Sequence, residues 1–99
     1  MNQQFIEEAI RSKSIVEFSY GNHRRVVEPH VVGVINGAVQ MLGYQIGGSS
    51  SSGGIPEWRR FDLNRINGLS STGQNFAGRR PFPSGQHSPW DYEILVVDP

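Results

Sequence analysis

Residues 31–46, VVGVINGAVQMLGYQI, carry the strongest structural signal in the sequence. Two mainly apolar runs flank the dipeptide Asn36-Gly37, which suits the two positive-φ positions of a type I′ turn. The stretch therefore predicts a β-hairpin with strands over Val31–Ile35 and Ala38–Ile46. Polar residues interrupt the stretch, and it is too short to cross a bilayer as a helix, so we expect no membrane span.

The preceding residues predict two further strands. In residues 16–20, VEFSY, apolar and polar side chains alternate, and the turn dipeptide Gly21-Asn22 follows. Residues 25–29, RVVEP, then resume the alternation. Pro29 has no N–H to donate to a ladder, so the second strand is expected to bend or to lie at an edge there.

A helix of about residues 3–12 is expected before these strands. Its apolar residues recur at helical spacing and form one stripe, Phe5, Ile6, Ala9 and Ile10. Acidic residues come early in it and basic residues late, which is the order that the helix dipole favours. The stripe predicts that the helix packs against a larger body rather than standing free.

The second half of the chain alternates between β patterning and irregular sequence. Residues 47–54 are glycine and serine only, which predicts a flexible loop. Residues 58–63 resume the β pattern, with Arg59, Phe61 and Leu63 on one face. Residues 67–89 show no clear period, and their glycines and prolines predict irregular chain. Residues 92–97, rich in β-branched side chains, are expected to form the strand that closes the sheet.

These elements predict a mainly β fold in one domain spanning residues 1–99. An N-terminal α-helix would be followed by five short strands that form a small β-barrel over about residues 14–97. The chain has 99 residues, of which 36% are hydrophobic and 18% charged, so two domains and large catalytic architectures are excluded. It contains no cysteine, which rules out disulfides and thiolate metal sites. The first four residues lack the features of a secretion signal, so we expect a cytoplasmic protein.

The charged residues point to local rather than global anion binding. Nine basic and nine acidic residues give a formal net charge of zero, so no overall field attracts nucleic acid. Eight of the nine basic residues are arginines, and six of them form adjacent pairs. Guanidinium groups bind phosphate with two parallel hydrogen bonds and stack on aromatic rings. The alternative is that these arginines cover sheet edges and pair with the acids.

Five segments, in this order, resemble the WYL domain of bacterial transcriptional regulators and defence-associated proteins. They are Ala9-Ile10, Val16-x-Phe18-x-Tyr20, Arg25-x-Val27-Glu28-Pro29, Gly37-x-x-x-x-Leu42-Gly43-Tyr44 and Arg59-x-Phe61-x-Leu63-x-Arg65-Ile66. The likeness covers about residues 5–69. It implies a helix followed by a five-stranded Sm-like β-barrel that acts in transcription regulation as a ligand-sensing module. The implied ligands are nucleotides or single-stranded nucleic acid.

The sequence departs from the family pattern at three places. The Trp-Tyr-Leu triplet that names the family is replaced by Gln40-Met41-Leu42, so two rings are absent. Asp62 stands at a usually basic position, and Asn64 at a usually acidic one. An acid beside the arginines would repel phosphate or engage a guanidinium, which weakens the case for phosphate binding.

The candidate binding residues are the polar and aromatic positions that match the family motif, namely Tyr20, Arg25, Tyr44, Arg59 and Arg65. Guanidiniums would hold phosphates, and each base stacked on a ring contributes about 1–3 kcal/mol. The alternative places both tyrosines in the barrel wall and pairs Arg25 with Glu28 or Asp62.

No catalytic residues, metal ligands or cofactor-binding residues are expected. The histidines His23, His30 and His87 lack the spacing of metal ligands, and no serine stands in a nucleophile motif. The sequence therefore predicts a non-enzymatic regulatory module that binds a nucleotide or single-stranded nucleic acid. The rival hypothesis is a protein–protein interaction module whose edge strands, such as Tyr92–Val97, pair with a second copy or an effector protein.

Overall fold

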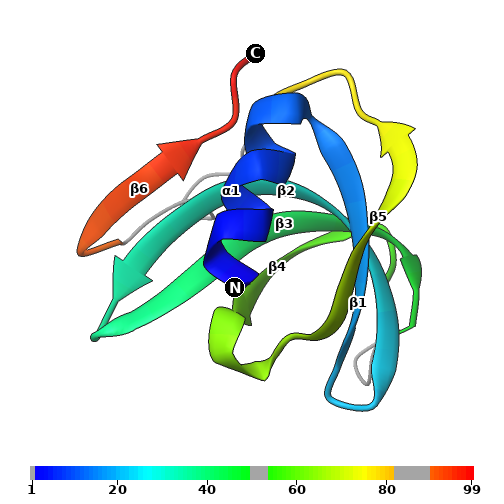
Figure 1. Ribbon diagram of the computed structural model, residues 1–99, viewed down its shortest axis with the longest axis horizontal. Coiled ribbons are helices and arrows are strands. Elements are labelled where there is room, and N and C mark those ends of the chain that lie inside the picture. The colour runs from blue at the N-terminus through cyan, green and yellow to red at the C-terminus, as the bar shows by residue number, and fades with distance from the viewer. Residues whose placement is uncertain (1, 50–53, 82–89) are drawn as a thin grey trace.

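The computed structural model describes residues 2–49, 54–81 and 90–99 and has the expected mainly β architecture (Figure 1). One N-terminal helix is followed by strands and a single 3₁₀ turn. The elements are α1 (Asn2–Ser12), β1 (Ser14–Tyr20), β2 (His23–Ile35), β3 (Ala38–Gly48), β4 (Glu57–Asp62), η1 (Leu63–Arg65), β5 (Asn67–Asn75) and β6 (Tyr92–Val96).

All strand pairs are antiparallel and belong to one sheet. Five strands follow the order β4-β3-β2-β1-β5, and β6 pairs with β2 outside this path. The sheet thus has six strands rather than the expected five. Within the described part of the chain no ladder joins β4 to β5, so a closed barrel is not confirmed.

Strand β2 organises the sheet because it merges two strands that the sequence pattern separates. The expected strands around residues 25–29 and 31–35 form one element of 13 residues. Its first half pairs with β1, and Val31–Val34 pair with β6, while β3 runs along the opposite edge. The register with β3 shifts between Pro29 and Val31. The expected irregularity at Pro29 therefore occurs, but as a bulge inside a strand rather than as an end.

The hairpin between β2 and β3 is confirmed. Asn36 and Gly37 have φ angles of 51° and 77°, the left-handed values that a type I′ turn requires. Val34 pairs with Val39 beside this turn. The turn between β1 and β2 also has two left-handed residues.

Strand β5 corrects the expectation of irregular chain over residues 67–89. Residues Asn67–Asn75 pair with β1, and Thr72 Oγ1 donates to the carbonyl of Ile15 at 3.0 Å. Residues 76–81 carry neither helix nor strand, as expected, and the remainder of this stretch to residue 89 lies outside the described residues. Half of the expected Gly/Ser loop, residues 50–53, also lies outside them, while β3 extends to Gly48.

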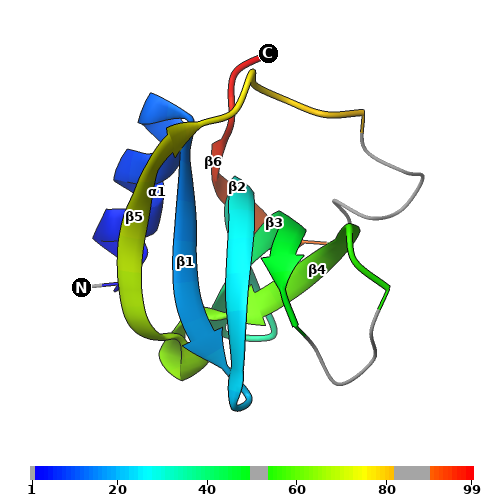
Figure 2. The ribbon, with the colours of Figure 1, turned by 90° about the vertical axis from the view of Figure 1, so that its right-hand side faces the viewer.

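Helix α1 packs on the sheet, as its apolar stripe predicts (Figures 1 and 2). Ile6, Ala9 and Ile10 are buried against the strands, whereas Phe5, the fourth residue of the expected stripe, is exposed. Asn2 Nδ2 donates to the carbonyls of Leu63 and Ile66, both at 3.0 Å, which ties the start of the helix to η1. The core between helix and strands also includes Val16, Phe18, Val27, Val32, Met41, Phe61 and Val97.

Candidate functional site

Arg25 lies at the centre of the predicted site. It follows from the alternation on β2 that its side chain points inward like that of Val27, and it is only 6% exposed. Nη1 donates to Gln45 Oε1 at 3.1 Å, and Nη2 donates to the carbonyl of Tyr20 at 3.2 Å. Both hydrogen-bond partners are neutral, so the pairing with Glu28 or Asp62 that the alternative interpretation required does not form. Burial and the nearby charge of Arg59 lower the pKa of Arg25.

Tyr20 brings two guanidiniums together. Its ring makes edge contacts with Phe61, with ring centroids 5.0 Å apart, and its hydroxyl accepts from the Asp62 N–H at 3.1 Å. The guanidinium carbons of Arg25 and Arg65 lie 5.6 Å and 5.1 Å from the centre of this ring. Cation–π attraction of about 0.5–2 kcal/mol orients such groups. Tyr20 therefore holds the end of β1 against the end of β4 and positions both arginines.

Arg59 completes the group and is the member that forms an ion pair. Its Nη2 lies 2.8 Å from Glu57 Oε2, and the two side chains are 16% and 52% exposed. Asp62, in contrast, does not pair with an arginine in the described structure, because its Oδ1 caps η1 by accepting from the Asn64 N–H at 3.0 Å. The acid that the sequence suggested as a competitor is thus engaged locally, and Glu57 takes that place.

A shallow polar hollow of about 360 Å³ lies beside these groups. Its described lining is Tyr20, Arg25, Glu57, Trp58, Arg59, Arg60 and Phe61. Among the described residues, the lining contains cationic donors and one carboxylate, Glu57. This arrangement suits the binding of a small anion. We call Arg25, Arg59 and Arg65 with Tyr20 the arginine site.

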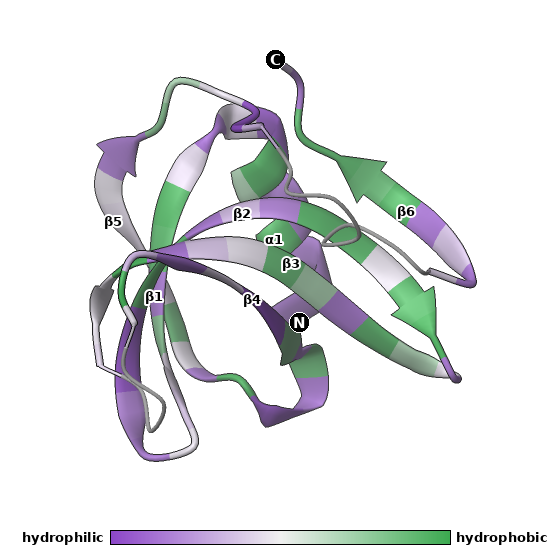
Figure 3. Ribbon diagram, turned by 180° about the vertical axis from the view of Figure 1, so that it is seen from behind, coloured by the Kyte–Doolittle hydropathy of each residue, from purple (hydrophilic) through white to green (hydrophobic). Residues whose placement is uncertain are grey.

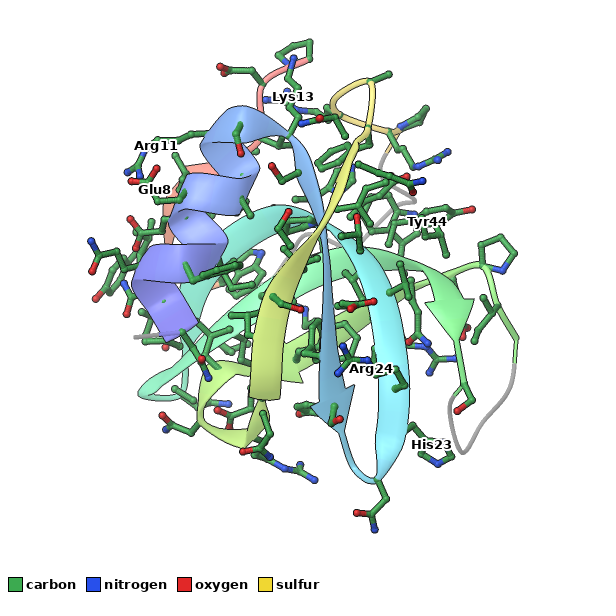
Figure 4. The ribbon with its side chains drawn as sticks, turned by 45° about the vertical axis from the view of Figure 1, so that its right-hand side comes forward. Glu8, Arg11, Lys13, His23, Arg24 and Tyr44 are labelled. Atoms are coloured by element: carbon green, nitrogen blue, oxygen red, sulfur yellow. The ribbon has the colours of Figure 1, made fainter. Side chains whose placement is uncertain are left out.

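Tyr44 does not join the arginine site. Its neighbour on β3, Gln45, points inward to Arg25, and consecutive strand residues face opposite ways. The ring of Tyr44 instead lies 5.1 Å from that of Trp58 and 4.5 Å from the guanidinium carbon of Arg80. Figure 4 shows Tyr44 well apart from Arg24 of β2. Four of the five predicted residues therefore come together.

Sequence reasoning missed a buried polar cluster on the outer side of β2. Arg80 donates two hydrogen bonds to the carboxylate of Glu28, from Nε at 2.6 Å and from Nη2 at 3.0 Å. His30, fully buried, donates from Nδ1 to the carbonyl of Glu28 and accepts from the Arg80 N–H at Nε2. These two bonds define a neutral imidazole, and burial lowers the pKa of His30. The cluster fastens residues 76–81 to the sheet.

Gln45 and Glu57 are the further residues at the arginine site that sequence reasoning missed. Gln45 is fully buried, and its amide bonds the carbonyls of Gly47 and Ser49 as well as Arg25. A polar residue at an inward position of a strongly apolar hairpin is a signal that could have identified it. Glu57 gives no such signal, because its role depends on where its side chain lies.

Another hollow, of about 450 Å³, lies between α1 and the β1–β5 pair. It is lined mainly by apolar and small polar residues, and Glu8 is its only charged described residue. It therefore does not suit an anion. In residues 2–49, 54–81 and 90–99 no three histidine, aspartate or glutamate side chains gather as metal ligands. The helix found there is not of a length and apolarity that would let it cross a membrane.

No protein-family model, curated protein or solved structure matches this chain. The arginine site and the resemblance in the sequence are therefore the features that bear on function.

Proposed function

We propose that the protein is a non-enzymatic regulatory module that binds a nucleotide or a short single-stranded nucleic acid at the arginine site. The observation that carries this proposal is the state of Arg25. Arg25 is only 6% exposed, and its hydrogen-bond partners among the described residues are neutral oxygens. A buried cation without a counter-ion is costly, and a phosphate in the adjacent hollow would compensate it.

The neighbouring groups support a ligand that carries a flat ring as well as a phosphate. The guanidinium of Arg65 lies over the ring of Tyr20, and nucleobases stack on such guanidinium planes. Tyr20 then acts as a support for Arg65 rather than as the stacking surface itself. The resemblance to WYL domains supports the same class of ligand.

The proposal includes a fold of the Sm-like barrel type. The order β4-β3-β2-β1-β5 leaves β4 and β5 as the two ends that a five-stranded barrel would bring together. The hydrogen bond from Asp62 N–H to the Tyr20 hydroxyl and the short turn η1 both connect this region. Strand β6 would then be an addition to the barrel along β2.

The test is a binding titration at low salt with a fluorescently labelled nucleotide and a labelled single-stranded oligonucleotide. Replacing Arg59 and Arg65 together by alanine removes one charge-assisted contact of about 1.5–3 kcal/mol and one stacking contact of about 1–3 kcal/mol, so we expect affinity to fall at least about 50-fold. The dependence of affinity on salt should flatten, because fewer counter-ions are released. Arg11→Ala is the matched control, since Arg11 pairs with Glu7 on the helix. Wild-type protein that binds neither probe refutes the proposal.

A second candidate is self-association through β6. This strand pairs with β2 on one side, and no described strand pairs with its other side. Its side chains Tyr92 and Ile94 are 61% and 36% exposed, and Figure 3 shows β6 as largely hydrophobic at its end. An exposed apolar edge strand is a template for pairing with a second copy. Light scattering at high concentration tests this: a dimer that Ile94→Glu abolishes supports it, and a strict monomer contradicts it.

A further inference from the structure

The positive charges that suit a ligand lie at one place on the protein. All nine arginines and lysines belong to the described residues, and three of them form the arginine site. Among the other six, carboxylates pair with Arg11, Arg24 and Arg80. Backbone carbonyls near the C-terminus accept from Lys13 and Arg79. The guanidinium carbon of Arg60, which also lines the hollow, lies 3.9 Å from the ring centre of Trp90. A site that binds a nucleic-acid strand has cations along successive phosphates. The described cations form no such track.

Within the hollow, Arg25 and Arg59 are the pair that suits a phosphate. Arg25 gives two of its five N–H groups to Gln45 and to the Tyr20 carbonyl. Burial, and then the charge of Arg59, lower the pKa of Arg25, so the two guanidiniums repel each other. A phosphate beside both groups would offset that repulsion. Glu57 competes for Arg59, but its side chain is 52% exposed, and it opposes every anionic ligand alike.

The described part of the site offers one surface on which a base can stack. The guanidinium carbon of Arg65 lies 5.1 Å from the ring centre of Tyr20, and Arg65 is exposed to solvent. The other aromatic residues of the lining are engaged within the protein. Phe61 is buried, and the ring of Trp58 lies 5.1 Å from that of Tyr44. Proteins that bind a strand stack its successive bases on several such surfaces.

The size of the hollow agrees with a single small ligand. Its volume of about 360 Å³ lies near the lower end of the range for small-molecule sites. We propose that the arginine site binds one mononucleotide and does not follow a strand: Arg25 and Arg59 hold the phosphate, and the Arg65 guanidinium stacks on the base. This inference rests on the proposed function and narrows its ligand to a nucleotide. An oligonucleotide would engage the site through one of its nucleotides, with the rest of the strand in solvent.

The first experiment varies the length of the ligand. A mononucleotide, a trinucleotide and a hexanucleotide of the same base, each with a 5′-phosphate, are titrated into the wild-type protein by calorimetry at low salt. We expect their affinities to agree within about fivefold, since each stacked base beyond the first would alone add about fivefold or more. Affinity that rises with every added nucleotide overturns this inference and leaves the proposed function standing.

The second experiment separates the phosphate from the base. A nucleoside 5′-monophosphate and ribose 5-phosphate are titrated into each variant and followed by NMR. Arg59→Ala should weaken both ligands at least about tenfold, because it removes a charge-assisted contact to the group that they share. Arg65→Ala should weaken the nucleotide at least about fivefold and leave ribose 5-phosphate nearly unchanged, because only the nucleotide carries a base.

Arg24→Ala is the matched control. Arg24 precedes Arg25 on β2, but it pairs with Glu17 and does not line the hollow, so both affinities should stay as in the wild type. Equal losses of the two ligands in Arg65→Ala overturn the assignment of the base to Arg65. Failure of the wild-type protein to bind any of the nucleotides overturns the proposed function itself.

Discussion

Replacing Arg80 by alanine should destabilise the protein by about 2 kcal/mol. The substitution removes both hydrogen bonds to the Glu28 carboxylate, whose side chain is only 4% exposed, and leaves that charge without its partner. Breaking a fully buried pair costs about 3–5 kcal/mol, but a surface pair is worth about 1 kcal/mol or less. Arg80 is 46% exposed, so solvent screens the pair and the expected cost lies between these limits. In a domain of this size that corresponds to a Tm lower by about 8–16 °C.

Urea unfolding followed by tryptophan fluorescence measures this cost for Arg80→Ala, Glu28→Gln and the double variant. Because the two groups touch, the double variant should be less destabilised than the sum of the single variants, with a coupling of about 1–2 kcal/mol. Arg11→Ala, which removes an exposed helical pair, should change the free energy of unfolding by less than about 0.5 kcal/mol. Additive effects of the single variants would show that the pair does not fasten residues 76–81, and the reasoning would fail.

Three further results are expected. The pKa of His30 lies below its ordinary value in the folded protein. The stability that the neutral imidazole contributes is therefore complete above about pH 6.5 and is lost as the pH falls below that value. The Tm should drop between pH 7 and 5, and it should drop less in His30→Phe. In thermal melts, Gly48→Ala should lower the Tm far more than Gly37→Ala does. A Cβ at Gly48 would lie 1.9 Å from the Arg24 carbonyl oxygen, whereas a Cβ at Gly37 would meet no atom within 4 Å. Gly37→Ala carries only the left-handed strain of about 1–2 kcal/mol. Phe61→Ala should cost about 3–5 kcal/mol in urea unfolding and also weaken nucleotide binding, since the ring supports Arg25 from within the core.

The local signals in the sequence predicted the helix and the central hairpin well. Asn36-Gly37 has few alternatives to a type I′ turn, and the apolar stripe of residues 3–12 has one natural packing face. The turn and the helix both depend on residues that are close together in the sequence. The helix therefore has nearly the expected bounds, and the turn lies where expected, although the first strand of the hairpin begins earlier, at His23.

Strand β5 shows what sequence patterning cannot reveal. Residues 67–75, NGLSSTGQN, contain one large apolar side chain and two glycines, so no period of two is visible. Their strand conformation comes from the ladder with β1 and from the bond of Thr72 to the Ile15 carbonyl. Tertiary pairing overrides the weak intrinsic preference of this segment. The same argument explains β2, where the bulge after Pro29 lets pairing on both edges continue past a residue that should stop it.

The arginine site was predictable in part because its members lie on strands whose alternation is visible. Arg25 and Arg59 share faces with Val27 and Phe61 in the sequence pattern, and both do face the same hollow. Tyr44 failed to join them because the same alternation turns it away from Gln45. Glu28 and Arg80 lie 52 positions apart in the sequence, and the pattern around neither residue predicts that they form a pair.

Strand β2 pairs with β1 along its first half and with β6 along its second half, and these two ladders should break at different stages of unfolding. Strands β1, β2 and β3 are joined by tight turns, whereas β6 adds to Val31–Val34 from about 60 residues further along the chain. Amide deuterium exchange should therefore reach β6 and its partner amides on β2 before the ladder with β1 loosens. Pro29, which carries no amide hydrogen, marks the border between the part of β2 that loses its β6 neighbour early and stays paired with β3, and the part whose ladder with β1 persists until global unfolding.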